Sequence, residues 1–226
     1  MKKFLLLSLF ASLCAALPAF AAATRGDSIE KIESCEAILQ EFMADPALAI
    51  PPEVFQKARA IVIANQARAG FFIGVKDGYA TMMVRRPDNT WSLPVILSSG
   101  EGSLGFQVGF TRIETIYIIT DDATPRLFFR NRFHVGVDAK AVAGPRFAER
   151  EHIDDVVLAN PVLVYTRNKG LFAGVSVKGG WFARNDDATN ALYNTTFTLP
   201  EILYSDWVQP NEDVVPLVNL VRSLAP

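Results

Sequence analysis

Apolar residues recur at helical spacing near the start of the chain and form short continuous runs further on. The segment Asp27-Ser28-Ile29-Glu30 places a capping side chain three residues before a carboxylate. Six apolar positions then follow three or four residues apart: Ile29, Ile32, Cys35, Ile38, Leu39 and Phe42. This spacing predicts an amphipathic helix over residues 28–44. Its polar face carries mainly glutamates, so an anionic membrane would repel it, and packing on a core is favoured.

Short extended runs separated by turn residues follow the predicted helix. The expected strands cover residues 61–63, 71–75, 79–86, 91–97, 105–110 and 113–119. Asp77-Gly78 and Pro87-Asp88-Asn89 predict hairpin turns between them. Glycines inside strand-like segments indicate bends, bulges or close sheet packing. The expected fold is therefore α+β, with a mainly antiparallel, strongly bent or barrel-like β-sheet and flanking helices.

Further helices are expected outside the strand-rich region. A brief helix is predicted at residues 53–59, and others at 121–130, 187–193 and 200–207. The tail after Pro210 is apolar at Val214, Val215, Leu217, Val218, Leu220 and Val221. This pattern is compatible with a short docking helix and with an interaction segment, and the sequence does not decide between them.

The first residues have the pattern of a secretory signal peptide. Lys2 and Lys3 precede an apolar run at 4–17, and Pro18 is followed by Ala19-Phe20-Ala21, a small-residue cleavage pattern. Cys14 raises the alternative of a lipoprotein, but Leu13 stands where lipoprotein processing requires a small residue. The predicted organisation is a signal peptide at 1–22, a domain at 23–210 and a tail at 211–226. We expect a bacterial protein that is periplasmic or secreted and associates peripherally with a membrane.

Charge and cysteine content narrow the function further. Without Lys2 and Lys3, the 22 basic residues become 20, against 24 acidic ones, and so mild an acidic balance disfavours nucleic acid as a partner. Only Cys35 would remain after cleavage, so no intramolecular disulfide is expected. We expect Cys35 to be a small apolar residue on a helix face.

The most informative segment is residues 165–179, which reads Tyr-Thr-Arg-Asn-Lys-Gly-Leu-Phe-Ala-Gly-Val-Ser-Val-Lys-Gly. Extended runs at 163–166 and 171–177 flank a polar Arg-Asn-Lys-Gly turn, which predicts a hairpin with Gly170 in a left-handed position. Other motifs precede it in order: residues 58–74, Trp91-Ser92-Leu93-Pro94, residues 102–109, Val135-Gly136-Val137-Asp138 and Ala143-Gly144-Pro145.

This ordered set, over roughly residues 30 to 205, resembles the SYLF domain family. The resemblance implies a domain associated with lipid binding, phosphoinositides in eukaryotic relatives, and with scaffolding of membrane or cytoskeletal machinery. It implies no known reaction. The acidic helix face at 28–44 departs from the basic N-terminal amphipathic segment of phosphoinositide-binding relatives.

Motifs of catalysis and cofactor binding are matched only in part. Residues 100–105 fit the Gly-x-Gly-x-x-Gly fingerprint, but residues 106–111 read as a strand and not as the helix that a dinucleotide requires. Residues 174–178 lack the final glycine of a nucleophile elbow around Ser176. His134 with Asp138, and His152 with its neighbouring aspartates, do not make a tetrahedral metal set. We expect no enzyme activity and no cofactor, although a hydrolase that uses either histidine is a weak third hypothesis.

Two basic clusters are the candidate lipid-binding sites. Residues 126–133 interleave arginines with phenylalanines, and Phe128, Phe129, Arg130 and Arg132 are the candidates there. In that hypothesis arginines meet lipid phosphates while a Phe inserts; in the alternative, the Phe side chains pack in the core. The second cluster is Arg167, Lys169 and Lys178, which could equally be a solvated turn.

The predicted function is an exported, non-enzymatic phospholipid-binding domain at the bacterial cell envelope. Its expected partner is phospholipid or an anionic membrane surface. The alternative is a periplasmic protein-interaction or scaffold module that binds an envelope protein without lipid.

Overall fold

The computed structural model describes residues 23–71, 73–104, 109–145, 153–169 and 180–226. Within these ranges one eight-stranded sheet runs in the order β5-β8-β3-β2-β1-β4-β7-β6. Its strands are β1 Ala60–Phe71, β2 Ile73–Val84, β3 Val95–Leu104, β4 Gly109–Ile119, β5 Phe133–His134, β6 Ala141–Ala143, β7 Val162–Lys169 and β8 Trp181–Arg184. Neighbours pair antiparallel except β6 and β7, which are parallel.

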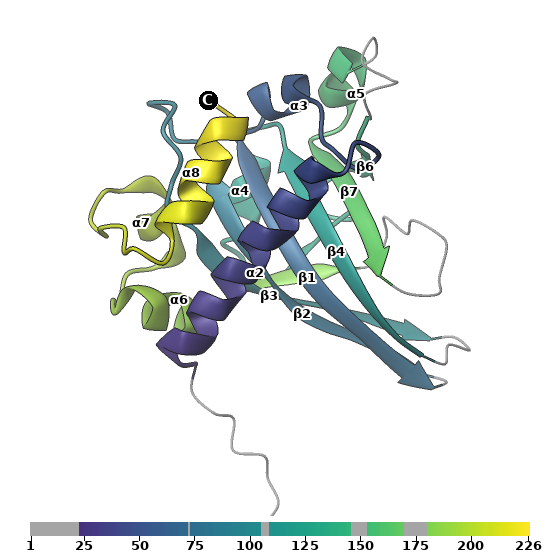
Figure 1. The fold of residues 1–226 in the computed structure, drawn as a ribbon, viewed down its shortest axis with the longest axis horizontal. Helices are drawn as coiled ribbons and strands as arrows, with labels where there is room; N and C mark the ends of the chain where they lie inside the picture. Colours follow the sequence, from purple (N-terminus) through teal and green to yellow (C-terminus); the bar gives the residue numbers. More distant parts are fainter. Residues whose placement is uncertain (1–22, 72, 105–108, 146–152, 170–179) are drawn as a thin grey trace, which may run out of the picture.

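Helices surround the sheet (Figure 1). Their bounds are α2 Arg25–Ala44, α3 Pro52–Gln56, α4 Thr124–Leu127, α5 Ile153–Ala159, α6 Asp186–Tyr193, α7 Leu199–Tyr204 and α8 Val215–Leu224. The long helix α2 crosses in front of the sheet and α4 lies behind it (Figure 1). The expected α+β class, with a mainly antiparallel, strongly bent sheet, is confirmed.

The sheet is curled into a half-barrel. Strands β4 and β8 are four positions apart in the sheet order, so in a flat sheet they would lie about 19 Å apart at the usual strand spacing of about 4.8 Å. The rings of Tyr117 on β4 and Phe182 on β8 are nevertheless only 5.3 Å apart, edge to face. Phe128 and Phe133 join them, with Phe128 stacked 4.2 Å from Phe133. These aromatic rings fill the trough of the half-barrel.

Helix α2 covers the other face of the sheet, and its predicted apolar positions are buried there. Ile32, Cys35, Ile38, Leu39 and Phe42 are buried, and the Cys35 thiol donates a hydrogen bond to the carbonyl of Ile63 on β1 at 3.4 Å. The central strands are thus covered on both faces, which explains their continuous apolar runs. The predicted helix at 28–44 is confirmed, with its cap at Thr24 instead of Asp27.

The predicted turn at Asp77-Gly78 is wrong. Both residues lie inside β2, where Asp77 pairs with Ala67 on β1 and Gly78 with Gln66. Because β2 is hydrogen-bonded on both sides, its ladders override the local turn preference. Glycine is needed at 78 for a different reason: a Cβ there would lie 2.3 Å from the carbonyl oxygen of Asn65. The other predicted turn, around Asn89, is confirmed by its φ of 65°.

The predicted turn at Arg167 is also placed wrongly. Strand β7 continues to Lys169, and Arg167 pairs with Glu114 and Lys169 with Arg112 on β4. The second arm of the predicted hairpin, residues 171–177, lies outside the described residues, as does Ser176. The Gly-x-Gly-x-x-Gly segment itself is strand up to Leu104, because β3 extends through Gly100 and Gly102. Of the strand expected at residues 106–111, residues 106–108 lie outside the described residues, and the rest begins β4 at Gly109.

The helices predicted at 187–193 and 200–207 are confirmed as α6 and α7. The helix predicted at 121–130 is too long. There α4 is a single turn at Thr124–Leu127, although Asp121 does accept a hydrogen bond from the Thr124 N–H at 3.2 Å, as a capping residue would. The apolar tail forms a docking helix, α8, whose Leu217, Val218 and Val221 are buried. In the described residues, no helix combines the length and the apolarity that crossing a membrane demands.

Candidate functional site: an arginine hollow

The aromatic half of the predicted 126–133 site lies mostly inside the protein. Phe128 is buried and packs against Phe133 and Phe182. Phe129 is partly buried, with its ring 6.0 Å from that of Tyr204. Neither ring is presented for insertion into a membrane in this structure. Phe128 instead packs in the core, as the alternative hypothesis for this segment expects.

The arginines of that segment are at the surface. Arg130 and Arg132 are exposed, and the Arg132 guanidinium lies 4.4 Å from the centre of the Trp181 ring. A cation over an indole face is held by the quadrupole of the ring. Arg130 makes no side-chain contact of this kind among the described residues, so it stays a candidate for an anion at the surface.

Arg167 is committed to other residues of the protein. Its Nε donates to Glu114 Oε2 at 2.8 Å, and its Nη2 reaches both Glu114 and Glu41. The guanidinium also lies over the Phe42 ring at 5.2 Å. Desolvation is the largest single influence on the pKa of Arg167 and lowers it, but the hydrogen bonds and charges of the two carboxylates together outweigh desolvation and leave the pKa raised. The backbone of Lys169 is at the end of β7, and Lys178 lies outside the described residues.

A basic hollow lies at the end of the sheet where β1 begins and β2 and β4 end. It has a volume of about 340 Å³ and is lined by Arg59, Arg85, Arg86, Pro87, Asp122, Pro125, Arg126 and Tyr204. We call this set the arginine hollow. The lining contains four arginines and one aspartate, and Asp206 next to it pairs with Arg86, so the hollow has a surplus of positive charge. Such a concave surface concentrates anions.

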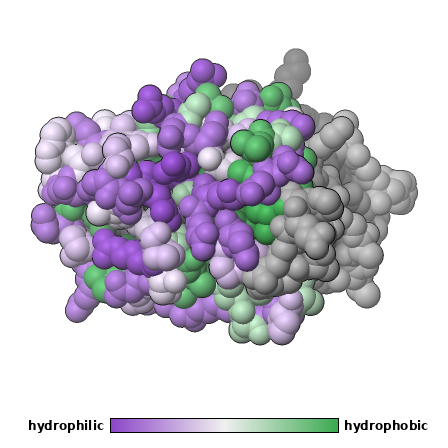
Figure 2. Space-filling view, turned by 90° about the horizontal axis from the view of Figure 1, so that it is seen from above, coloured by the Kyte–Doolittle hydropathy of each residue, from purple (hydrophilic) through white to green (hydrophobic). Residues whose placement is uncertain are grey.

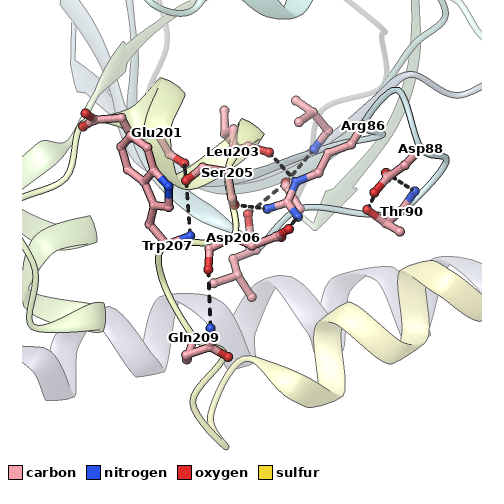
Figure 3. Close-up of polar contacts among 12 residues, drawn as sticks. Arg86, Asp88, Thr90, Glu201, Leu203, Ser205, Asp206, Trp207 and Gln209 are labelled. Carbon is pink, nitrogen blue, oxygen red and sulfur yellow. Dashed lines mark hydrogen bonds and ion pairs between the residues drawn. The ribbon is translucent and has the colours of Figure 1, made fainter.

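Arg86 is the structural member of the arginine hollow (Figure 3). Its Nε donates to the carbonyl of Leu203 at 2.9 Å, and its other nitrogens reach the Ser205 carbonyl and the Asp206 carboxylate. A cation at a helix C-terminus stabilises the unpaired carbonyls there. Arg86 therefore fixes the end of α7, and with it the position of Tyr204.

Arg85 and Arg59 are close enough to oppose each other's charge. Burial and then the neighbouring Arg59 lower the pKa of Arg85. One nitrogen of Arg85 donates to the Ala225 carbonyl at 2.8 Å, while its buried Nε has no hydrogen-bond partner among the described residues. Arg59 is 3.6 Å from an exposed carboxylate of Asp122. An anion placed between Arg59 and Arg85 would relieve this repulsion.

Tyr204 and Arg126 form the outer rim of the hollow. Tyr204 is 38% exposed. Burial raises the pKa of Tyr204, and the nearby Arg126 opposes that shift through its charge and a hydrogen bond. The hydroxyl therefore stays protonated at neutral pH and can donate to an anion. Arg126 is exposed and adds a second donor at the rim.

His134 and Asp138, four residues apart in the sequence, are in contact in the structure. His134 Nδ1 is 3.5 Å from Asp138 Oδ2, and that carboxylate also accepts the His134 backbone N–H at 2.6 Å. Among the described residues, no group of three or more His, Cys, Asp or Glu side chains is arranged to hold a metal ion. His152 lies outside the described residues.

Sequence reasoning missed three members of the arginine hollow because they are far apart in the chain. Arg59 precedes β1, while Arg85 and Arg86 follow β2. The adjacent pair Arg85-Arg86 at the end of a predicted strand was the available signal. Arg126 is the first residue of the segment 126–133 that the sequence singled out. It was not among the candidate lipid-binding residues chosen in that segment.

These observations define a class of protein: an α+β half-barrel domain with a basic hollow at one end. A family model described as "Ysc84: Las17-binding protein actin regulator" matches residues 100–224, more than half of the chain. The chain belongs to this family, the Ysc84 or SYLF domain family, which confirms the resemblance seen in the sequence. The family is described by a binding and regulatory role and not by a reaction.

Several curated eukaryotic proteins are similar to the chain. LAS seventeen-binding protein 3 of Saccharomyces cerevisiae is 31% identical over 189 residues, which cover 82% of this chain and 40% of that protein. An SH3 domain-containing protein of Schizosaccharomyces pombe is 32% identical over 164 residues, 71% of this chain and 38% of that protein.

SH3 domain-containing YSC84-like protein 1 of Rattus norvegicus is 25% identical over 190 residues, 80% of this chain and 56% of that protein. The chain thus spans about two fifths of the length of the two yeast relatives. No solved structure matches the chain significantly.

Proposed function

We propose that this domain is exported, binds anionic phospholipid at the surface of a bacterial cell envelope and catalyses no reaction. The observation that carries the proposal is the arginine hollow, whose lining contains four arginines and one aspartate. Planar guanidinium groups bind phosphate oxygens in pairs. The signal-peptide pattern of residues 1–22 supports export.

The end of the sheet that holds the hollow is the surface that would face the membrane. Arg59 and Arg126 are the cations there that are most available, because Arg86 is bonded to the end of α7 and Arg85 to Ala225. Figure 2 shows mostly hydrophilic residues with scattered apolar patches over this part of the described surface. Attachment is therefore mainly electrostatic, at about 1 kcal/mol for each arginine near an anionic surface.

Flotation with liposomes tests the proposal. The purified protein is mixed with vesicles of phosphatidylcholine alone, or with added phosphatidylglycerol or cardiolipin, at low and high salt. We expect flotation only with anionic lipid, and its loss at high salt, because salt screens exposed charges. Arg59→Gln/Arg126→Gln removes the two available cations of the hollow and should reduce flotation about tenfold or more.

Two further variants make the experiment specific. Arg112→Gln removes an exposed charge from the opposite end of β4 and should change flotation little. Arg130→Gln/Arg132→Gln removes the two exposed arginines that the sequence singled out. If this pair abolishes flotation while the hollow variant does not, lipid binds at residues 130–132 instead. Absence of flotation under every condition would contradict lipid binding.

The alternative function is a protein-interaction module that binds an envelope protein without lipid. The names of the yeast relatives favour it, because one of them is a LAS seventeen-binding protein. It predicts no flotation with any vesicle.

A further inference from the structure

We propose that Trp207 is the centre of a docking surface for an arginine side chain of a protein partner. The inference is independent of lipid binding and uses a different surface from the arginine hollow. Its first basis is exposure: the Trp207 side chain is 63% exposed. The Phe197 ring lies beside the indole, with 5.5 Å between the ring centres and an angle of 48° between the ring planes. An indole in water on a folded surface is typical of the residues that dominate binding interfaces.

The three tryptophans of the chain supply the second basis. Arg85 lies over the Trp91 ring at 5.2 Å, and Arg132 lies over the Trp181 ring at 4.4 Å. No arginine or lysine lies over Trp207 in the part of the chain that the structure describes, where its only ring contact is with Phe197. Among the described residues, the indole without a cation over it is thus the most exposed of the three. A cation from another molecule would complete the arrangement that the other two already have.

The negative charge of the segment around Trp207 favours a cation as the group that binds there. Residues 199–213 contain neither Lys nor Arg, and of their four carboxylates Asp206 pairs with Arg86 and Asp213 with Arg25. Glu201 and Glu212 make no ion pair among the described residues and leave the segment negatively charged. Hydrogen bonds from the hydroxyl and backbone N–H of Thr198 lower the pKa of Glu201, so its carboxylate is ionised at neutral pH. In the view of Figure 3, Glu201 and Trp207 lie on the same side of the α7 end, and Arg86 lies on the other. The same carboxylates would repel an anionic membrane, which makes lipid the wrong occupant.

The surface is also held in place before any partner arrives. The backbone N–H of Trp207 donates to the Ser205 hydroxyl at 3.3 Å, and that hydroxyl donates to the Glu201 carbonyl. The Arg86 guanidinium donates to the Ser205 carbonyl and to the Asp206 carboxylate. The Gln209 side chain donates to the Asp206 carbonyl at 3.4 Å. Figure 3 shows these contacts as one connected set. A surface fixed in this way loses little conformational entropy on binding.

Arginine fits better than lysine for a geometric reason. A guanidinium is planar, so it can stack on the indole and direct its N–H groups in the ring plane towards carboxylates such as Glu201. A lysine ammonium offers a point charge without that plane. The partner is therefore an extended segment that carries exposed arginine.

Tryptophan NMR tests the proposal directly. The probe is a short acetylated and amidated peptide of glycine, proline and two arginines, compared with the same peptide in which neutral citrulline replaces arginine. The protein is labelled with 15N at tryptophan, and the indole N–H signal of Trp207 is assigned with Trp207→Phe. We expect a saturable shift of this signal with the arginine peptide. The citrulline peptide should bind more weakly by a factor of about ten or more.

Variants separate the surface from general effects, and because those at Trp207 lack its indole signal, their peptide binding is measured by titration calorimetry. Trp207→Ala should abolish peptide binding while the NMR signals of Trp91 and Trp181 report an intact fold, and Trp207→Phe should keep part of the binding. Leu158→Ala, which removes another highly exposed apolar side chain, should bind as the wild type does. Equal responses to the two peptides, or no shift of the Trp207 signal at millimolar peptide, would overturn the proposal. So would a Trp207 signal that responds to phosphatidylglycerol vesicles or to protein dilution but not to the arginine peptide.

Discussion

Replacing Arg167 by glutamine tests whether this residue supports the fold or binds lipid. Arg167 on β7 joins Glu114 on β4 and Glu41 on α2. The Glu114 side chain is only 3% exposed and that of Arg167 is 17% exposed. Breaking a buried ion pair by removing one partner costs about 3–5 kcal/mol. Because Glu114 keeps its other contacts, we expect a loss near the lower end, about 3 kcal/mol of the free energy of unfolding.

Urea unfolding followed by circular dichroism measures this loss. Thermal unfolding gives a second measure of the same loss: in a domain of about 200 residues its midpoint should fall by about 6–12 °C. Arg130→Gln is the control, because it removes the same charge from an exposed position and should change stability by less than about 0.5 kcal/mol. Adding Glu114→Gln to Arg167→Gln should recover part of the loss. An Arg167→Gln protein that keeps its stability but no longer floats with anionic vesicles would refute this reasoning and assign Arg167 to lipid.

Two further predictions concern the core. Gly100→Ala places a Cβ 2.5 Å from Cζ2 of Trp181 and should cost about 1–3 kcal/mol in urea unfolding, whereas Gly26→Ala, whose Cβ would have no atom closer than 3.9 Å, should be neutral or slightly stabilising. Burial raises the pKa of Cys35 from about 9 to about 12. Between these pH values the native state keeps a proton that the unfolded chain loses. The free energy of unfolding should therefore fall as the pH rises through this interval, by at most about 1.4 kcal/mol per pH unit. Cys35→Ala should remove that part of the slope in unfolding measured between pH 8 and pH 11, and an unchanged slope would show that Cys35 is not its source.

The sequence predicted elements well where local signals and tertiary packing agree. Helix α2 has one apolar face, and the same face is buried. Around Asp77-Gly78 the two disagree, because a turn dipeptide lies in a strand that is paired on both sides. The apolar tail could not be assigned from its own pattern, since the core that buries Leu217 and Val221 comes from distant parts of the chain.

The arginine hollow and the Trp207 surface show why local density of charge is a poor guide to a binding site. Arg167 belongs to a cluster that stands out in the sequence, yet Glu114 and Glu41 engage it. Arg59 and Arg126 stand far apart in the sequence and line the same hollow only in the folded structure. A side chain is available to a partner only after the intramolecular contacts have been satisfied, and those contacts are set by the fold. By the same reasoning, the informative tryptophan is the one over which the described part of the chain places no cation.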